Sequence, residues 1–267
     1  MQSAECKMKT DTKRVRPILR WPGGKTRLLP MILPLIKPHV CYGEPFAGGL
    51  AVLLAKEQSP REVVNDLNGE VVNLYTQVKF HLPEMEREIE WILNSRKSLF
   101  AFMGQPGLTE IQRASRWLMR NKMSFSGNME SFGVAKTRGG GASQSRYGLM
   151  EAMRELNRRI DKVTFENIDY AHFIRLYDSK ETFFFIDPPY LHAKVKTYAG
   201  WNEEQMQALR KVVDGIKGNW VLTVDASEFN RELFGDFKLR RAVSENKAVN
   251  KRLNPDRTFA EFIITPQ

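Results

Sequence analysis

The chain's most apolar stretch ends in Asp187-Pro188-Pro189-Tyr190, a group suited to chemistry on an amine. An exocyclic amine on a planar ring is a poor nucleophile, because its lone pair is delocalised into the ring. The Asp187 carboxylate and the Pro188 carbonyl can each accept one amine hydrogen, while the proline rings hold the backbone rigid. Tyr190 offers a face for stacking a base, worth about 1–3 kcal/mol in single-strand binding sites. These four residues are the predicted catalytic group.

A second group, Trp21-Pro22-Gly23-Gly24-Lys25, lies near the start of the chain. With Thr26 it matches the end of a nucleotide phosphate loop. Leu19, however, stands where that loop requires its first glycine, and proline removes a backbone N–H that would bind phosphate. The sequence therefore disfavours ATP or GTP hydrolysis.

A third group, Glu44-Pro45-Phe46-Ala47-Gly48-Gly49, follows a predicted strand and opens a helix. Asp66 ends the next predicted strand, where a carboxylate can hold ribose hydroxyls. A dinucleotide dehydrogenase has these features too, but its G-x-G-x-x-G pattern is absent. A glycine turn and a ribose acid suit any nucleoside-bearing cofactor, so they do not select NAD.

The elements that must position these groups alternate between strand and helix. Apolar runs predict strands at 40–46, 62–66, 163–169, 182–190 and 219–225, and helical patterns occupy 48–57 and 202–216. Asn202 and Gln205 have the spacing of a helix capping box. This alternation predicts an α/β fold with a mostly parallel sheet, whose strand carboxyl ends carry the ligand groups. The last two apolar segments, 236–243 and 258–265, predict an antiparallel pair.

The region 81–160 interrupts that alternation with predicted helices at 84–103, 110–122 and 147–160 and a Gly/Ser-rich loop at 124–148. We therefore expect a flexible N-terminus (1–15), a catalytic domain (16–80 and 161–267) and an inserted, mainly helical domain (81–160). Between Arg113 and Lys162 there are eleven Lys/Arg and four Asp/Glu, an excess of +7 out of a net +10 for the whole chain. A polyanion is the predicted partner of this insert.

Composition excludes other classes. The two cysteines and four histidines lack zinc-site spacing, so we predict no metal. No apolar run approaches the ~20 residues of a membrane helix, and the first nineteen residues lack the apolar block of a secretory signal. We expect no membrane association and a cytoplasmic location.

Four motifs occur in the order "RWPGGK", "EPFAGG", "VVNDLN" and "DPPY". The insert lies after the glycine motif "EPFAGG" and "VVNDLN" and before "DPPY". In this the chain resembles the Dam-type (D12 class) DNA adenine methyltransferases, clearly over 17–190. The resemblance implies a Rossmann-like methyltransferase sheet, the cofactor S-adenosylmethionine, and methyl transfer to the N6 amine of an adenine flipped out of double-stranded DNA. It also implies a bacterial, prophage or phage origin and a monomer, with a weak dimer left open.

The resemblance assigns cofactor contacts by motif. Lys25 would meet the methionine carboxylate, Asp66 the ribose, and Asp169-Tyr170 the adenine. The cofactor-binding residues it implies are Trp21, Gly23, Gly24, Lys25, Glu44, Pro45, Phe46, Gly48, Asp66, Leu67, Asp169, Tyr170 and Asp187. One departure is the glycine motif, which reads F-A-G-G-L where the family more often has F-x-G-x-G.

The candidate DNA contacts come from the basic insert: Arg116, Arg120, Lys122, Ser124, Phe125, Lys136, Arg138 and Arg146. Arg116 and Arg120 also fit a solvated helix face, and Ser124-Phe125 also fit a loop cap with a core aromatic. Three other functions stay open: cytosine-N4 methylation, RNA adenine methylation, and DNA binding without catalysis.

Overall fold

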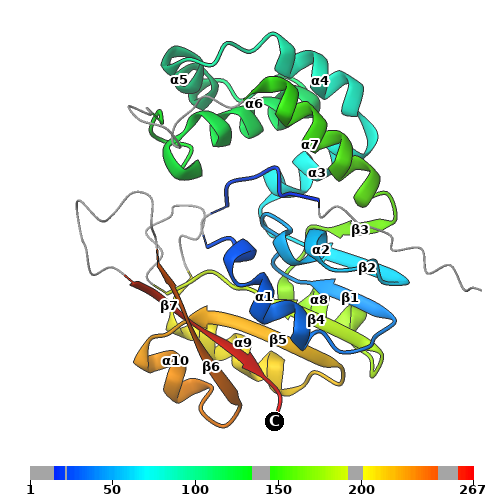
Figure 1. Ribbon diagram of the computed structural model, residues 1–267, viewed down its shortest axis with the longest axis vertical. Coiled ribbons are helices and arrows are strands. Elements are labelled where there is room, and N and C mark those ends of the chain that lie inside the picture. The colour runs from blue at the N-terminus through cyan, green and yellow to red at the C-terminus, as the bar shows by residue number, and fades with distance from the viewer. Residues whose placement is uncertain (1–14, 22, 134–144, 192–200, 246–257) are drawn as a thin grey trace, which may run out of the picture.

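The computed structural model describes residues 15–21, 23–133, 145–191, 201–245 and 258–267. At its centre lies a seven-stranded sheet in the order β3-β2-β1-β4-β5-β7-β6 (Figure 1). The strands are β1 (Cys41–Glu44), β2 (Arg61–Asn65), β3 (Val163–Glu166), β4 (Thr182–Ile186), β5 (Asn219–Asp225), β6 (Lys238–Glu245) and β7 (Thr258–Thr265). Strands β1 to β5 pair in parallel, and β7 is antiparallel to both of its neighbours. The predicted α/β fold with a C-terminal antiparallel pair is confirmed.

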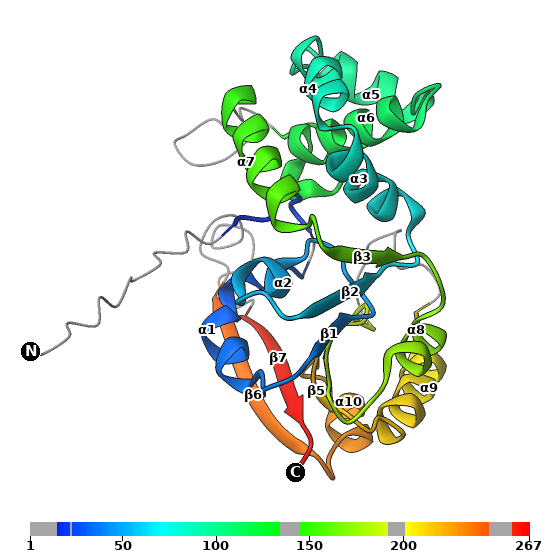
Figure 2. The same ribbon diagram turned by 90° about the vertical axis from the view of Figure 1, so that its right-hand side faces the viewer.

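Strand β4 is buried along its whole length, which a parallel strand requires when helices cover both sheet faces. Alternate residues of β4 serve two separate cores: Phe183 and Phe185 face one, and Phe184 and Ile186 face the other. Figure 2 shows α1 (Leu29–Ile32) and α2 (Ala51–Ala55) on one face, and α8 (Tyr170–Tyr177) and α9 (Glu203–Asp214) on the opposite face.

The order in which strands are added to the sheet reverses between β1 and β4, although the two strands are parallel. From β1 the sheet grows outward through β2 to β3, and from β4 it grows the other way to β5. Cys41 pairs with Thr182 in parallel register, so the carboxyl ends of β1 and β4 lie side by side. This topological switch point is where open α/β sheets bind their ligands.

A group of helices lies at one end of the sheet (Figure 1). It comprises α4 (Leu82–Glu90), α5 (Arg96–Gly104), α6 (Glu110–Met123) and α7 (Arg146–Arg159), and α3 (Gly69–Phe80) packs against it. The single helix predicted at 84–103 is wrong, because the chain leaves helical geometry after α4. Ser95 then starts α5 by accepting a hydrogen bond from the Ser98 amide.

Other local predictions can be checked directly. The Asn202–Gln205 capping box is confirmed at the start of α9. The short segments η1 (Lys25–Arg27) and η2 (Leu33–Leu35) flank α1, η3 (Phe125–Gly127) follows α6, and α10 (Glu228–Leu233) follows β5. Residues 1–14 of the predicted flexible N-terminus and residues 134–144 of the Gly/Ser-rich loop lie outside the described residues. Across the described part of the chain, no helix has the length and apolar character needed to cross a membrane.

Candidate functional site

The loop after β1 is held in a fixed shape by its glycine. Gly48 has φ +44°, donates its amide to Asp66 Oδ2 at 2.8 Å, and accepts from the Tyr75 hydroxyl at 2.8 Å. A Cβ on Gly48 would lie 2.7 Å from Trp21 Nε1, so the indole packs directly on the loop. The N-terminal tryptophan block and the glycine block, separate in sequence, therefore form one structure.

Leu50 explains the departure in the glycine motif. It occupies the position of the second motif glycine in F-x-G-x-G and has φ 57°, in the left-handed region that favours glycine. Its side chain is fully buried in the core around α2. Burial of the leucine offsets the backbone strain of about 1–2 kcal/mol that a side chain carries in this conformation.

Asp66 joins the ends of two strands. Its Oδ2 accepts from the Gly48 amide, and its Oδ1 accepts from the Asn68 amide at 2.9 Å. Burial raises the pKa of Asp66, and these two hydrogen bonds partly oppose the rise. Leu67, beside it, is exposed. The carboxylate stands at the carboxyl end of β2, next to the glycine loop, where the predicted ribose contact requires it.

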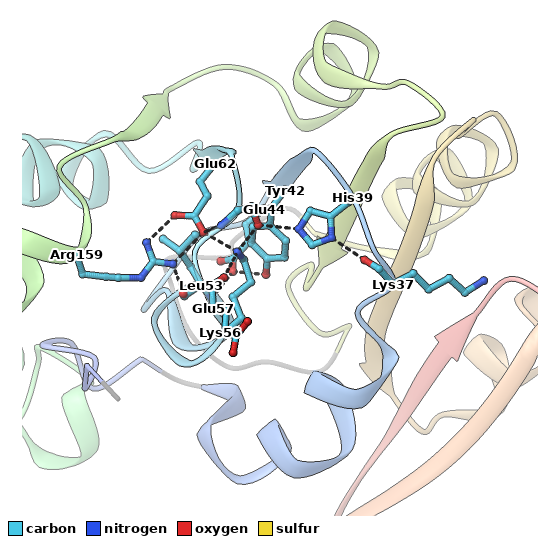
Figure 3. Close-up of polar contacts among 10 residues, drawn as sticks. Lys37, His39, Tyr42, Glu44, Leu53, Lys56, Glu57, Glu62 and Arg159 are labelled. Atoms are coloured by element: carbon cyan, nitrogen blue, oxygen red, sulfur yellow. Dashed lines mark hydrogen bonds and ion pairs between the residues drawn. The ribbon is translucent and has the colours of Figure 1, made fainter. Parts of the chain in front are cut away.

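Glu44 lies inside the protein, beneath the loop (Figure 3). Its Oε1 accepts hydrogen bonds from the Tyr42 hydroxyl at 2.7 Å and the Leu53 amide at 2.8 Å. Burial raises its pKa to about 7. These contacts tie the end of β1 to α2, and Asn65 adds a bond to the Pro45 carbonyl at 3.0 Å. Glu44 thus stabilises the loop from the protein interior by linking β1 to α2.

Three aromatic rings meet next to this loop. Phe46 stacks on Tyr170 with 5.3 Å between ring centroids, and Trp201 meets both rings edge-on at 5.7 and 5.8 Å. The indole Nε1 of Trp201 is buried without a hydrogen-bond partner. Asp169 caps α8, accepting from the amides of Ala171 and His172. Of the predicted Asp169-Tyr170 pair, only Tyr170 therefore contributes to the aromatic cluster.

Asp187 follows β4 at the switch point. Its Oδ1 accepts from the Thr223 hydroxyl at 2.8 Å and lies 2.8 Å from Lys25 Nζ. Within the described residues, its Oδ2 makes no hydrogen bond. Burial raises the pKa of Asp187, while Lys25 and Thr223 act in the opposite direction. Thr223 and Lys25 thus fix the carboxylate through one of its two oxygens.

Lys25 lies within the catalytic group. Its side chain is 3% exposed, and Nζ donates to the Gly23 carbonyl at 2.6 Å. The same ammonium is 3.8 Å from Glu261 Oε2 and 4.8 Å from the centre of the Tyr190 ring. Gly23 has φ +78°, and the Gly24 amide donates to the Trp21 carbonyl, which turns the chain so that Lys25 points at Asp187. Pro22 lies outside the described residues.

No cluster of three or more His, Cys, Asp or Glu side chains that could hold a metal occurs in the described ranges.

The predicted DNA contacts on α6 are partly engaged within the protein. Arg116 donates to the Gln105 carbonyl at 3.0 Å, and Arg120 donates to the Met129 carbonyl at 3.3 Å. Burial lowers the pKa of Arg120. Ser124 is buried and links the Asn121 carbonyl to the Met129 amide. Its hydroxyl therefore shapes the turn after α6.

Two cations meet where α6 reaches the N-terminal segment. Asn121 on α6 exchanges two hydrogen bonds with the backbone of Arg20, at 2.9 and 3.0 Å. Burial, followed by the nearby Arg20 charge, lowers the pKa of Lys122 to about 8. Neither side chain forms an ion pair within the described part of the chain. Phe125 in the following turn is 44% exposed.

Of the remaining predicted DNA contacts, the structure describes only Arg146, which is exposed and donates to the Glu90 carbonyl at the end of α4. Lys136 and Arg138 lie outside the described residues.

The fold and site together are those of an α/β enzyme: a glycine loop lies after β1, an acid after β2, and a carboxylate held by Thr223 and Lys25 at the switch point, where sheets of this kind bind ligands. The family is the D12 class of N6 adenine-specific DNA methyltransferases, to which the chain belongs, since the family model matches residues 21–247. The protein is therefore a DNA adenine methyltransferase, and the resemblance drawn from the four motifs is confirmed.

Relatives of similar length support this membership. The chain is 27% identical to a type II methyltransferase of Lactococcus lactis subsp. cremoris, over 94% of this chain and 95% of that protein. It is 25% identical to a DNA adenine methylase of Haemophilus influenzae, over 91% and 90%. A type II methyltransferase of Paramecium bursaria Chlorella virus NC1A is 24% identical over 84% and 88%.

Sequence reasoning missed four residues at the site. Thr223 and Glu261 are isolated polar residues in strands, and sheet register alone brings them to Asp187. Trp201 precedes a helix cap and carried no motif. Arg20 directly precedes Trp21 and is the first residue of the "RWPGGK" motif, which was the available signal.

Proposed function

We propose that the protein transfers the methyl group of S-adenosylmethionine to the N6 amine of an adenine flipped out of double-stranded DNA. The observation that carries this proposal is the state of Asp187. Its Oδ1 is held by Thr223 and Lys25, and its Oδ2 is left without a hydrogen bond among the described residues. A carboxylate fixed through one oxygen can accept an amine hydrogen with the other and needs no reorganisation to do so.

The residues around Asp187 fit the cofactor. The Gly48 turn, which a Cβ would fill, lets backbone approach a ligand closely, and Asp66 offers acceptors for ribose hydroxyls. The Phe46, Tyr170 and Trp201 rings suit a flat purine, and the unpartnered Trp201 Nε1 is a donor for one of its nitrogens. When bound, S-adenosylmethionine supplies an electrophilic methyl group on a sulfonium.

Asp187 and Pro188 are the proposed acceptors of the two amine hydrogens, with Tyr190 stacking on the base. Placing the amine in line with the carbon–sulfur bond can supply roughly 7–11 kcal/mol of the barrier reduction. With the cofactor bound, the amine nitrogen would bond to the methyl carbon as the carbon–sulfur electron pair leaves on sulfur, and the nitrogen would then give up one proton. Asp187 is a suitable acceptor for that proton, because burial raises its pKa.

Base flipping costs a few kcal/mol, which contacts to the DNA backbone must offset. We propose the inserted helical region, 81–160, as the target-recognition domain. Its basic excess supports this, as do the exposed Phe125 after α6 and the Arg20 and Lys122 cations, which form no ion pair among the described residues. The remaining residues, 16–80 and 161–267, form the proposed catalytic domain.

The test is to incubate purified protein with S-adenosylmethionine and either duplex DNA of mixed sequence or RNA, and to analyse the nucleosides by mass spectrometry. We expect N6-methyladenine in DNA only. N4-methylcytosine, methylated RNA, or DNA binding without any product would each replace the proposal with the corresponding alternative.

A further inference from the structure

Glu261 is a carboxylate on β7 that reaches the catalytic group from the opposite side to Asp66. It pairs in register with Asp225 on β5, and its side chain is 13% exposed. The next two residues show which way it points. Phe262 belongs to the core on one sheet face, and Ile263 belongs to the core on the other face. Glu261, two residues from Ile263, faces the same side as Ile263.

The Glu261 carboxylate is poorly satisfied. Its Oε2 is buried and makes no well-formed hydrogen bond within the described residues; Lys25 Nζ lies 3.8 Å away, and the Tyr190 hydroxyl, also without a well-formed bond, interacts with the same carboxylate. A buried carboxylate oxygen held this weakly carries a desolvation cost, so its retention here needs a reason other than stability.

Lys25 lies between two carboxylates. Its ammonium is 2.8 Å from Asp187 Oδ1 and 3.8 Å from Glu261 Oε2. With both acids ionised, the three groups carry a net charge of −1. Without Glu261, the Lys25–Asp187 pair would be neutral, and a carboxylate neutralised by a close ammonium is a weaker hydrogen-bond acceptor.

We propose that Glu261 is a positioning residue for methyl transfer: it shares the Lys25 ammonium with Asp187 and thereby leaves negative charge on Asp187 for the target amine. This inference rests on the proposed function. The negative charge that it preserves on Asp187 would stabilise positive charge in the reaction, because the amine nitrogen becomes positive and the cofactor is a sulfonium cation. Such preorganised charge acts strongly in a site that is shielded from water.

The groups that face Glu261 in the described structure come from three elements: Lys25 from η1, Asp187 and Tyr190 from the segment after β4, and Asp225 from β5. Burial raises the pKa of Glu261; Lys25 and the Tyr190 hydroxyl lower it, and Asp187 and Asp225 raise it. Like charges oppose one another's ionisation, so an ionised Glu261 beside the shared ammonium also disfavours ionisation of Asp187. Removal of the Glu261 charge should therefore lower the pH at which Asp187 becomes deprotonated.

The experiment measures single-turnover methylation of duplex DNA between pH 5 and 9. Glu261→Gln should lower the maximal rate about tenfold. In free energy, a tenfold loss is equivalent to a shift of about one pKa unit. The acid limb of the profile should move to lower pH, because Glu261 acts through the charge on Asp187. Glu228→Gln, at an exposed glutamate paired with Arg231, is the matched control and should behave as wild type.

Two further variants separate charge from shape. Glu261→Asp keeps the charge and should keep the wild-type acid limb, and a limb displaced as far as in Glu261→Gln would contradict the proposal. In a Lys25→Met background, Glu261→Gln should have no additional effect, because the ammonium through which Glu261 acts is absent. An equal loss in both backgrounds would assign Glu261 to packing of β7.

The result that overturns the inference is a Glu261→Gln enzyme with wild-type rate and wild-type acid limb. The wild-type enzyme in the same assay distinguishes failure of this inference from failure of the proposed function. If the wild type itself transfers no methyl group, the proposed function fails.

Discussion

Arg159 anchors the helical region to the sheet, and its replacement by methionine is the change whose effect the structure defines best. It lies at the end of α7, is 7% exposed, and donates to both oxygens of Glu62 on β2, at 2.6 and 2.9 Å. It also donates to the Leu53 carbonyl at 2.6 Å. Figure 3 shows this network with Lys56, whose ammonium is 2.5 Å from Glu62.

Removing one partner of a buried ion pair typically costs about 3–5 kcal/mol. Arg159→Met leaves the Leu53 carbonyl without this donor, but Glu62 keeps Lys56, so we expect the low end, about 3 kcal/mol. Burial alone would raise the pKa of Glu62, yet hydrogen bonds from Arg159 and Lys56 hold it below its ordinary value. For a chain of this size, such a loss lowers Tm by roughly 6–12 °C.

The assay is urea unfolding followed by circular dichroism and tryptophan fluorescence. Arg154→Met is a matched control, because Arg154 lies on the same helix and makes the same two-bond contact, to Glu86 at 2.8 and 3.0 Å. Arg154 is 49% exposed, so solvent screens its contact and its loss should destabilise the protein much less than the loss of Arg159. Similar losses in both variants would refute the argument that burial gives the Arg159 contact its weight.

Three more outcomes are expected. Gly48→Ala forces a side chain against Trp21 at positive φ, and should weaken S-adenosylmethionine binding more than tenfold by calorimetry; unchanged affinity would exclude the glycine loop from the cofactor site. Leu50→Gly relieves about 1–2 kcal/mol of strain but removes a buried side chain worth about 2–5 kcal/mol, so urea unfolding should show net destabilisation, and a gain in stability would contradict this. Since the Lys122 pKa is lowered to about 8, its ammonium loses charge as pH rises, and DNA affinity by fluorescence anisotropy should fall between pH 7 and 9; Lys122→Met should abolish this decline, and a decline that persists would remove Lys122 from the interface.

The sequence predicted those parts of the fold that depend on contiguous residues. Apolar runs marked β1 to β5, and the acids and glycines after them marked the carboxyl edge of the sheet. A helix break is harder to see, because the pattern across 84–103 stays amphipathic on both sides of the Ser95 cap. Local hydrogen bonding at that cap outweighed the continuous periodicity.

In the candidate site, too, the residues within a contiguous motif could be predicted, and those brought in by strand pairing could not. Asp187 was accessible because a motif surrounds it, whereas Thr223 and Glu261 reach it only through the pairing of β4, β5 and β7. Charge counting indicated the basic insert but not the partners of its side chains. Arg116, for example, is bonded to a backbone carbonyl of its own helical region.

The most direct test of the central claim compares Asp187→Asn with wild type in single-turnover methylation of duplex DNA, with product nucleosides identified by mass spectrometry. The substitution keeps the shape of the side chain and its Oδ1 contact with Thr223 but removes the charged acceptor. Removing one preorganised group of this kind costs about 10²–10³ in rate. We predict a loss of at least that size in N6-methyladenine formation, with folding and DNA binding retained. An Asp187→Asn enzyme that methylates adenine at the wild-type rate would contradict the account.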